Sequence, residues 1–157
     1  MRIILHYRND VNKNHYKPLD RCKAVAAITS LLKMFLRDLS SPLIPRSVVD
    51  MCLTLDLAGS LNKNSISQII QDIKKNVALL PTLNYNVLRF LMLHLNRVAA
   101  NEENKMSAQS LAIIFGQNLV PNKTPVNHNI GGILIEAEKT NIFVELLIKH
   151  VDDIFTK

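Results

Sequence analysis

The strongest constraint on the fold of this chain is an apolar pattern of helical period between Arg21 and Leu39. At about 100° per residue, its apolar side chains fall on one arc about 140° wide. The arc contains Ala24, Val25, Ile28, Leu31, Leu32, Phe35, Leu36 and Leu39. Pro42 and Pro45 follow and end the segment, because proline lacks the backbone donor that a continuing helix needs. The segment therefore predicts an amphipathic helix that buries one face.

The same period recurs in five further segments of the chain. They cover residues 48–55, 64–80, 83–100, 108–119 and 133–155. Thr82 and Ser107 are expected to cap two of these helices, since a hydroxyl accepts from the free N–H groups of a first helical turn. No segment alternates apolar and polar residues as a strand does, and four glycines leave little punctuation for short strands. The sequence predicts an all-α, multi-helix bundle.

The length of 157 residues favours a single domain over residues 1–157. Within it we expect a partial helix and a loop over residues 1–19, and a helical core over residues 20–157. Residues 121–129 hold two prolines and three asparagines, which is typical of a surface loop. No apolar run approaches the ~20 residues that cross a bilayer, and the apolar start is too short for a signal peptide. We expect a cytoplasmic protein.

The formal charge of +6 bears on the class of partner. A basic chain favours nucleic acid, an anionic membrane or an acidic protein surface. Nucleic-acid binders concentrate their charge and add aromatic side chains for stacking. Here the 19 lysines and arginines are scattered and tryptophan is absent. We therefore expect an acidic protein surface as the partner and no nucleic acid, with peripheral contact to a membrane left open.

No arrangement of residues in the sequence indicates a reactive site, a metal or a cofactor. Cys22 and Cys52 belong to no C-x-x-C or Cys/His pattern, so both are expected to be buried thiols rather than metal ligands. His94 falls within the apolar arc of residues 83–100 and is expected in the core. No glycine-rich phosphate loop follows a strand. The chain is thus expected to act by binding another protein.

Two cations share one face of the first helix. Lys33 and Arg37 are four residues apart and project opposite the apolar arc. Taken alone they also fit a solvated face, since like charges at this spacing cost a helix only a few tenths of a kcal/mol. Asn104 fits a turn or cap before the next helix, and Asn118 fits a polar residue near that helix's end. The residue pattern by itself leaves the function of all four open.

Three blocks of sequence, taken in order, resemble the Rho GTPase-activating (RhoGAP) domain. The blocks are LLKMFLRDL at 31–39 with PLIP at 42–45, LP at 80–81 with Asn84 and the run 87–95, and NKMS at 104–107 with SLAIIFG at 110–116 and NL at 118–119. Because the blocks are separate and correctly ordered, the resemblance is specific over residues 20–119.

This resemblance implies a helical bundle that packs on the switch regions of a GTP-bound Rho, Rac or Cdc42-like protein. It also implies site residues. Lys33 and Arg37 take the positions of the family's K-x-x-x-R helix, which lines the GTPase-contacting face. Asn104 takes the position of a polar contact at the same site, and Asn118 is a candidate for an additional contact. Such a domain regulates the GTPase activity of another protein and is not itself an enzyme.

The sequence departs from the family at its catalytic element. The arginine finger lies in a Gly-(Ile/Leu/Phe)-(Phe/Tyr)-Arg-x-Ser-Gly loop, and no such motif occurs in this chain. Arg8 is the nearest candidate, but it has neither the preceding glycine nor the following Ser-Gly. We interpret residues 1–8 as the end of the helix that follows the finger loop. A finger is worth about 10³ to 10⁵ in rate, so we expect binding with weak activation unless other sequence supplies it.

Two prolines of the family pattern are also missing. The family's Leu-Pro-x-Pro-Leu becomes LSSPL at 39–43, and its Phe-Gly-Pro becomes FGQ at 115–117. Losing them relaxes two turns near the contact face.

The alternative function is a catalytically silent helical adaptor, whose partner binding would not depend on Lys33 and Arg37.

Overall fold

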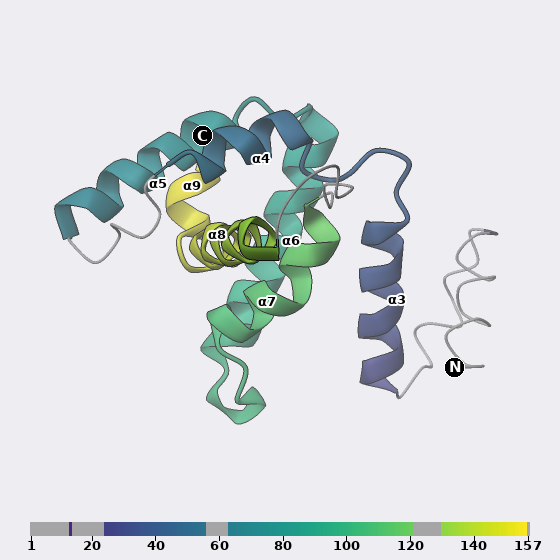
Figure 1. Ribbon diagram of the computed structural model, residues 1–157. Coiled ribbons are helices and arrows are strands. Elements are labelled where there is room, and N and C mark those ends of the chain that lie inside the picture. Colours follow the sequence, from purple (N-terminus) through teal and green to yellow (C-terminus); the bar gives the residue numbers. More distant parts are fainter. Residues whose placement is uncertain (1–12, 14–23, 56–62, 121–129, 157) are drawn as a thin grey trace. The chain divides into compact units, whose positions relative to one another are not determined.

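The computed structural model describes residue 13 and residues 24–55, 63–120 and 130–156 (Figure 1). All regular elements in these ranges are helices, which confirms the all-α prediction. The chain divides into two compact units, residues 1–40 and residues 41–157. The expectation of a single domain stays a prediction, and the calls on residues 1–8 and 121–129 lie outside the described ranges.

The described residues of the first unit contain one helix, α3, Val25–Arg37. Its C-terminus is closed by Asp38, whose backbone N–H donates to the carbonyl of Met34. Leu31 and Leu36 are buried, whereas Phe35 is about half exposed. The buried stripe of α3 is therefore narrower than the apolar arc that the sequence predicts.

The second unit is built around one long helix, α8. Its elements are α4 (Arg46–Leu53), α5 (Lys63–Val77), α6 (Thr82–Ala100), the 3-10 turn η2 (Glu102–Asn104), α7 (Ala108–Leu119), α8 (Ile130–Lys149) and α9 (Val151–Ile154). Helix α8 contacts α4, α6, α7 and α9, and Figure 1 looks nearly along its axis. Phe143, Leu147 and Ile148 of α8 are fully buried. An apolar side of α8 thus supplies the centre of this unit.

The helix ends test the predicted caps. Ser107 is the N-cap of α7, and its hydroxyl accepts from the backbone N–H of Ser110, as expected. Thr82 is wrong as a cap: it is the first residue of α6, and Pro81 holds the N-cap position. The predicted last helix is also wrong in its continuity, because it breaks at His150 into α8 and α9. No glycine or proline marks that break in the sequence, so the periodicity missed it.

His94 is exposed, which contradicts its expected place in the core. The buried side of α6 is formed by Leu88, Leu91, Met92 and Leu95. Phe90, another member of the predicted arc, is 77% exposed. The physical reason is that the apolar residues of α6 cover a wider arc than its packing partners do, so His94 lies on the uncovered side.

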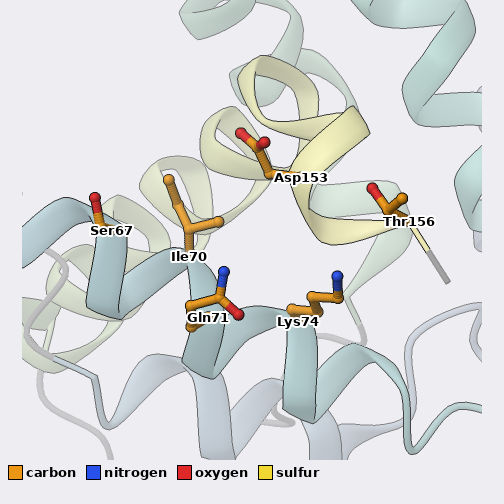
Figure 2. A pocket seen from close by; sticks show the side chains of 6 residues that line it. All are labelled: Ser67, Ile70, Gln71, Lys74, Asp153 and Thr156. Atoms are coloured by element: carbon orange, nitrogen blue, oxygen red, sulfur yellow. The ribbon is translucent and has the colours of Figure 1, made fainter.

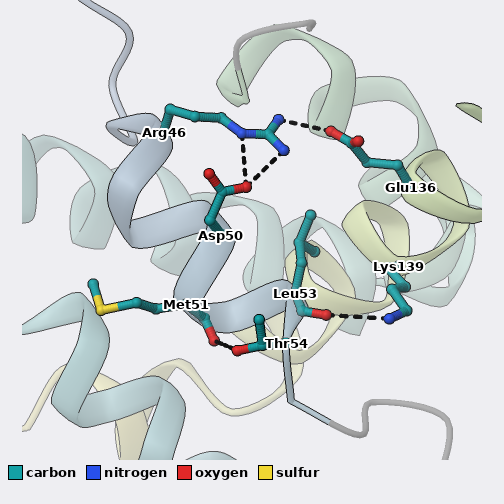
Figure 3. Close-up of polar contacts among 7 residues, drawn as sticks. All are labelled: Arg46, Asp50, Met51, Leu53, Thr54, Glu136 and Lys139. Atoms are coloured by element: carbon teal, nitrogen blue, oxygen red, sulfur yellow. Dashed lines mark hydrogen bonds and ion pairs between the residues drawn. The ribbon is translucent and has the colours of Figure 1, made fainter. Parts of the chain in front are cut away.

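Helix α4 is tied to α8 at both of its ends (Figure 3). At its start, Arg46 pairs through Nη1 with Oε1 of Glu136 at 2.7 Å and through Nη2 with Oδ1 of Asp50 at 2.7 Å. At its end, Nζ of Lys139 donates to the carbonyl oxygen of Leu53 at 3.3 Å, an acceptor that the helix itself leaves free. Glu136 and Lys139 are three residues apart and share one face of α8. These contacts fix the segment that enters α4.

Among the described helices, none combines the length and the apolar content of a membrane span.

Helices α7 and α8 approach closely at Gly116, which is buried. A Cβ atom at this position would lie 3.2 Å from Oδ1 of Asn141, 3.6 Å from Cγ2 of Thr140 and 3.9 Å from Cγ2 of Val144. The first distance is tighter than ordinary contact, and it is to a side-chain atom rather than to backbone. Glycine therefore fits this contact because it has no Cβ atom, and a larger residue would displace the side chain of Asn141.

We expect Gly116→Val to lower the free energy of unfolding by about 1–3 kcal/mol, because its branched side chain overpacks the α7–α8 contact. Gly116→Ala should stay within about 1 kcal/mol of wild type, since better helix propensity offsets the displacement of Asn141. Urea unfolding followed by circular dichroism measures both. Gln117→Val, at an exposed neighbour, is the control for valine in a helix. Equal stability of Gly116→Val and Gln117→Val would contradict the packing argument.

Candidate functional site

The structure places the two predicted cations on the C-terminal half of α3. Arg37 is its last residue, and its side chain is 62% exposed. The Nε atom lies 3.3 Å from Oδ1 of Asp38, its neighbour in sequence. Lys33 is half-buried, one turn earlier. A cation in the last turn also suits the negative end of the helix dipole. The contact with Asp38 can therefore orient the side chain of Arg37 while its guanidinium group faces solvent.

Asn104 lies in a tight turn of the second unit, between α6 and α7. Its Nδ2 donates to the carbonyl oxygen of Val98 at 3.2 Å, near the C-terminus of α6. Asn101 starts the turn, and its side chain accepts from the backbone N–H of Glu103. Lys105 then adopts a left-handed conformation with φ of 51°, which costs a non-glycine residue about 1–2 kcal/mol. The amide of Asn104 thus shapes the turn, and the side chain stays exposed.

Asn118 lies near the other end of α7. Its Nδ2 donates to the carbonyl oxygen of Ile114 at 2.9 Å, so the side chain folds back on its own helix and is half-buried. Ten residues separate Asn118 from the start of α7, which is about 15 Å along a helix. Asn104 and Asn118 are therefore not brought together, whereas Lys33 and Arg37 are neighbours on α3.

The residue pattern does not predict one polar contact at the start of α6. Nδ2 of Asn84, in the first turn of α6, donates to the carbonyl oxygen of Leu43 at 2.9 Å and lies 3.5 Å from that of Pro42. In the sequence, Asn84 is one of the residues that carry the family resemblance, and the residue pattern indicates no contact for it. Its partners are 41 and 42 residues away, so no local signal pointed to the contact.

A surface cleft of about 440 Å³ lies between α5 and α9 (Figure 2). Its lining consists of Ser67, Ile70, Gln71, Lys74, Asp153 and Thr156. Figure 2 shows Lys74 and Gln71 on α5 facing Asp153 and Thr156 at the end of the chain. The lining has no histidine or cysteine, and its charges are of both signs. We therefore assign no chemistry to it.

In the part of the chain that the structure describes, no three His, Cys, Asp or Glu residues gather to hold a metal ion.

Comparison with known proteins decides the family. The family model described as "RhoGAP domain" matches residues 3–124 of this chain. The chain belongs to the RhoGAP domain family. Its helical fold agrees with this, since the crystal structure of human Rho GTPase activating protein 15 superposes on 98% of the chain with a TM-score of 0.83 at 28% identity, over 70% of that structure's chain.

Curated relatives are similar over most of this RhoGAP domain. GEM-interacting protein from Mus musculus is 38% identical over 141 residues, which is 82% of this chain and 14% of that protein. Rho GTPase-activating protein 25 from Homo sapiens is 31% identical over 122 residues, which is 77% of this chain and 18% of that protein. The chain thus spans less than a fifth of the length of these two relatives.

Cys52 of the RhoGAP domain is a buried thiol, as predicted, whereas Cys22 lies outside the described residues. Burial raises the pKa of the Cys52 thiol to about 11, and a weak hydrogen bond from Asn76 opposes this shift. The folded state therefore holds the proton to higher pH than the unfolded state does. The stability that this proton contributes is present below about pH 9 and is lost as the pH rises toward 11.

We expect the Cys52 thiol to react at least about 100-fold more slowly in the folded protein than in the denatured protein at pH 8, because a pKa raised by two units leaves about 100-fold less thiolate. Absorbance after addition of Ellman's reagent measures the rate. A Cys22→Ser background isolates the signal of Cys52. Equal rates in buffer and in guanidinium chloride would refute the buried, protonated thiol.

Proposed function

We propose that this RhoGAP domain binds a Rho-family GTPase in its GTP-bound form through the α3 face that carries Lys33 and Arg37. The observation that carries the proposal is the exposed guanidinium of Arg37, with Lys33 one turn away on the same face. Family membership supports the class of partner. The net charge of +6 supports an acidic surface as its complement.

The chemistry of the two cations suits such a surface. Arginine offers a rigid fork of donors that matches a carboxylate, and lysine adds a compact charge that steers association. The contact between Arg37 and Asp38 is solvent-exposed, so it contributes little and a partner's carboxylate can replace it. Arg37 is therefore the stronger of the two expected contacts.

Asn104 and Asn118 are proposed as secondary contacts. The Nδ2 atoms of both are bound to backbone carbonyls within the chain. Each amide nitrogen has a second N–H, so a contact with a partner can use that donor or the carbonyl oxygen of the side-chain amide. Asn104 is the better placed of the two, because its side chain is exposed and Asn118 is half-buried.

The proposed regulation is binding with weak acceleration of GTP hydrolysis by residues 1–157, unless other sequence supplies the finger. Acceleration by this family rests on an arginine that stabilises charge on the transferring phosphoryl group. The finger motif does not occur in the sequence, and the nearest candidate, Arg8, has neither the preceding glycine nor the following Ser-Gly of that motif. Contacts of the α3 face can order the partner's switch regions, but they supply no cation to the phosphates.

We expect Arg37→Ala to weaken binding to a GTP-loaded Rho, Rac or Cdc42 protein by about 10- to 100-fold, since a charged hydrogen bond is worth about 1.5–3 kcal/mol. Lys33→Ala should weaken it by a smaller factor. Isothermal titration calorimetry with GTPases carrying a non-hydrolysable GTP analogue measures the affinity, and GDP-loaded protein should bind more weakly.

Arg97→Ala and Lys75→Ala are matched controls for this experiment. Arg97 is an exposed arginine in the last turn of α6, and Lys75 is an exposed lysine of α5, so each removes the same charge elsewhere. If the α3 variants and the controls bind equally well, the α3 face is not the docking site. That result would support the alternative function as a catalytically silent adaptor. If no member of the GTPase panel binds at tens of micromolar, the proposed function is rejected.

We also expect the wild-type chain to accelerate GTP hydrolysis by less than about 10³-fold, the lower bound of what an arginine finger supplies. Single-turnover release of phosphate, at saturating domain, measures this factor. Acceleration beyond that bound would contradict the expectation, and an Arg8→Ala variant would then test whether Arg8 acts as the finger.

A further inference from the structure

Ser40 follows the cationic face of α3 at a spacing that occurs nowhere else in the chain. It is the only serine or threonine of the 157 residues with an arginine or lysine, here Arg37, three positions before it. Many serine kinases select an arginine at this spacing through acidic residues of their substrate groove. Ser40 also stands where the family's Leu-Pro-x-Pro-Leu pattern has a proline. This chain therefore places a hydroxyl group where the family pattern has none.

The segment around Ser40 is accessible to another protein. Arg37, Asp38, Ser40 and Ser41 are exposed, and Leu39 is half-buried. Helix α3 ends at Arg37 with Asp38 as its cap, so only the last turn of the helix has to open for this segment to become extended. Helix ends fray at little cost in free energy. A kinase can therefore bind residues 37–41 without unfolding the rest of α3.

A phosphate on Ser40 would change the charge beside Arg37. The two Cα atoms are three residues apart, which is at most about 11 Å along the chain. Phosphoserine carries a charge of about −1.5 to −2 and three acceptor oxygens. Arg37 already contacts one acidic group of its own chain, since its Nε lies 3.3 Å from Oδ1 of Asp38. A phosphate is the stronger partner, because a guanidinium group binds it with two parallel hydrogen bonds.

We propose that Ser40 is a regulatory phosphorylation site, at which a serine kinase and ATP switch off docking of the GTPase on Arg37. This inference rests on the proposed function of the α3 face and uses residues of the first unit alone. In the reaction, Oγ of Ser40 forms a bond to the γ-phosphorus of ATP. The bond from that phosphorus to the ADP oxygen breaks, and the hydroxyl proton passes to a base of the kinase. The phosphate then pairs with Arg37 and repels an acidic partner surface.

The first test is whether the folded chain accepts a phosphate at Ser40. The full chain is incubated with ATP and an activated calmodulin-dependent protein kinase, a class that selects arginine at this spacing, and fragment-ion mass spectrometry locates the phosphate. We expect modification of Ser40, slowed at least about tenfold in Arg37→Ala because the kinase loses a charged hydrogen bond. Ser41→Ala should be modified at the wild-type rate. A phosphate on Ser41 in place of Ser40, or none on either, rejects the inference.

The second test measures binding of the phosphorylated chain. Phosphoserine is encoded in place of Ser40, and calorimetry follows titration with a GTP-analogue-loaded Rho, Rac or Cdc42 protein. We expect the dissociation constant to rise about 10- to 100-fold, as for the loss of a charged hydrogen bond. Phosphoserine in place of Ser67 is the control, because Ser67 is an exposed serine of α5 and the added charge is the same. It should raise the dissociation constant less than about twofold.

A double-mutant cycle tests whether the phosphate acts through Arg37. In an Arg37→Ala background, phosphoserine in place of Ser40 should raise the dissociation constant less than about threefold, because its pairing partner is absent. Ser40→Ala should bind the GTPase as the wild-type chain does, and it should keep that affinity after treatment with the kinase.

Four binding results would overturn the inference. Equal affinity of the phosphorylated and unmodified chains rejects it and leaves the proposed function standing. An equal loss with phosphoserine in place of Ser40 or Ser67 also rejects it, because that loss would reflect net charge alone. A full loss in the Arg37→Ala background rejects the pairing with Arg37. If the unmodified chain binds no member of the GTPase panel, the proposed function and this inference fail together.

Discussion

The second unit depends on the burial of α8 against the helices around it, and on the close approach of α7 at Gly116. Glycine at this position lets the side chains of Thr140, Asn141 and Val144 lie within 4 Å of the place that a Cβ atom would take. The polar side chains of α8 use the same placement. Glu136 and Lys139 hold the two ends of α4, and the turn before α4 is thereby fixed as well. The arrangement of the polar contacts thus follows from where α8 is packed.

Much of the helical structure could be predicted from the sequence, because its signals are local. Proline and a hydroxyl cap mark the ends of several helices, as Ser107 does for α7. The errors in predicted burial have one physical cause. Periodicity shows which side chains are apolar, but it does not show which neighbour covers them, so His94 was placed in the core and is exposed. The break at His150 likewise has no local residue signal.

The candidate site was predictable to a smaller extent. Lys33 and Arg37 came from their shared helical face together with a family resemblance, and the matched family model agrees with that resemblance. The contacts of Asn84 and Arg46 were not predictable from the residue pattern, because their partners are 41 and 90 residues away. The structure adds that Asn104 and Asn118 each use one amide N–H inside the chain, which fixes how their side chains are oriented.

The central claim is that the cationic face of α3 is the surface that meets the GTPase. Acetylation footprinting of lysines, read by mass spectrometry with and without a GTP-loaded partner, tests it most directly. The account predicts that Lys33 is protected in the complex while Lys75, on α5, reacts at an unchanged rate. Equal acetylation of Lys33 in the free and bound states would contradict it.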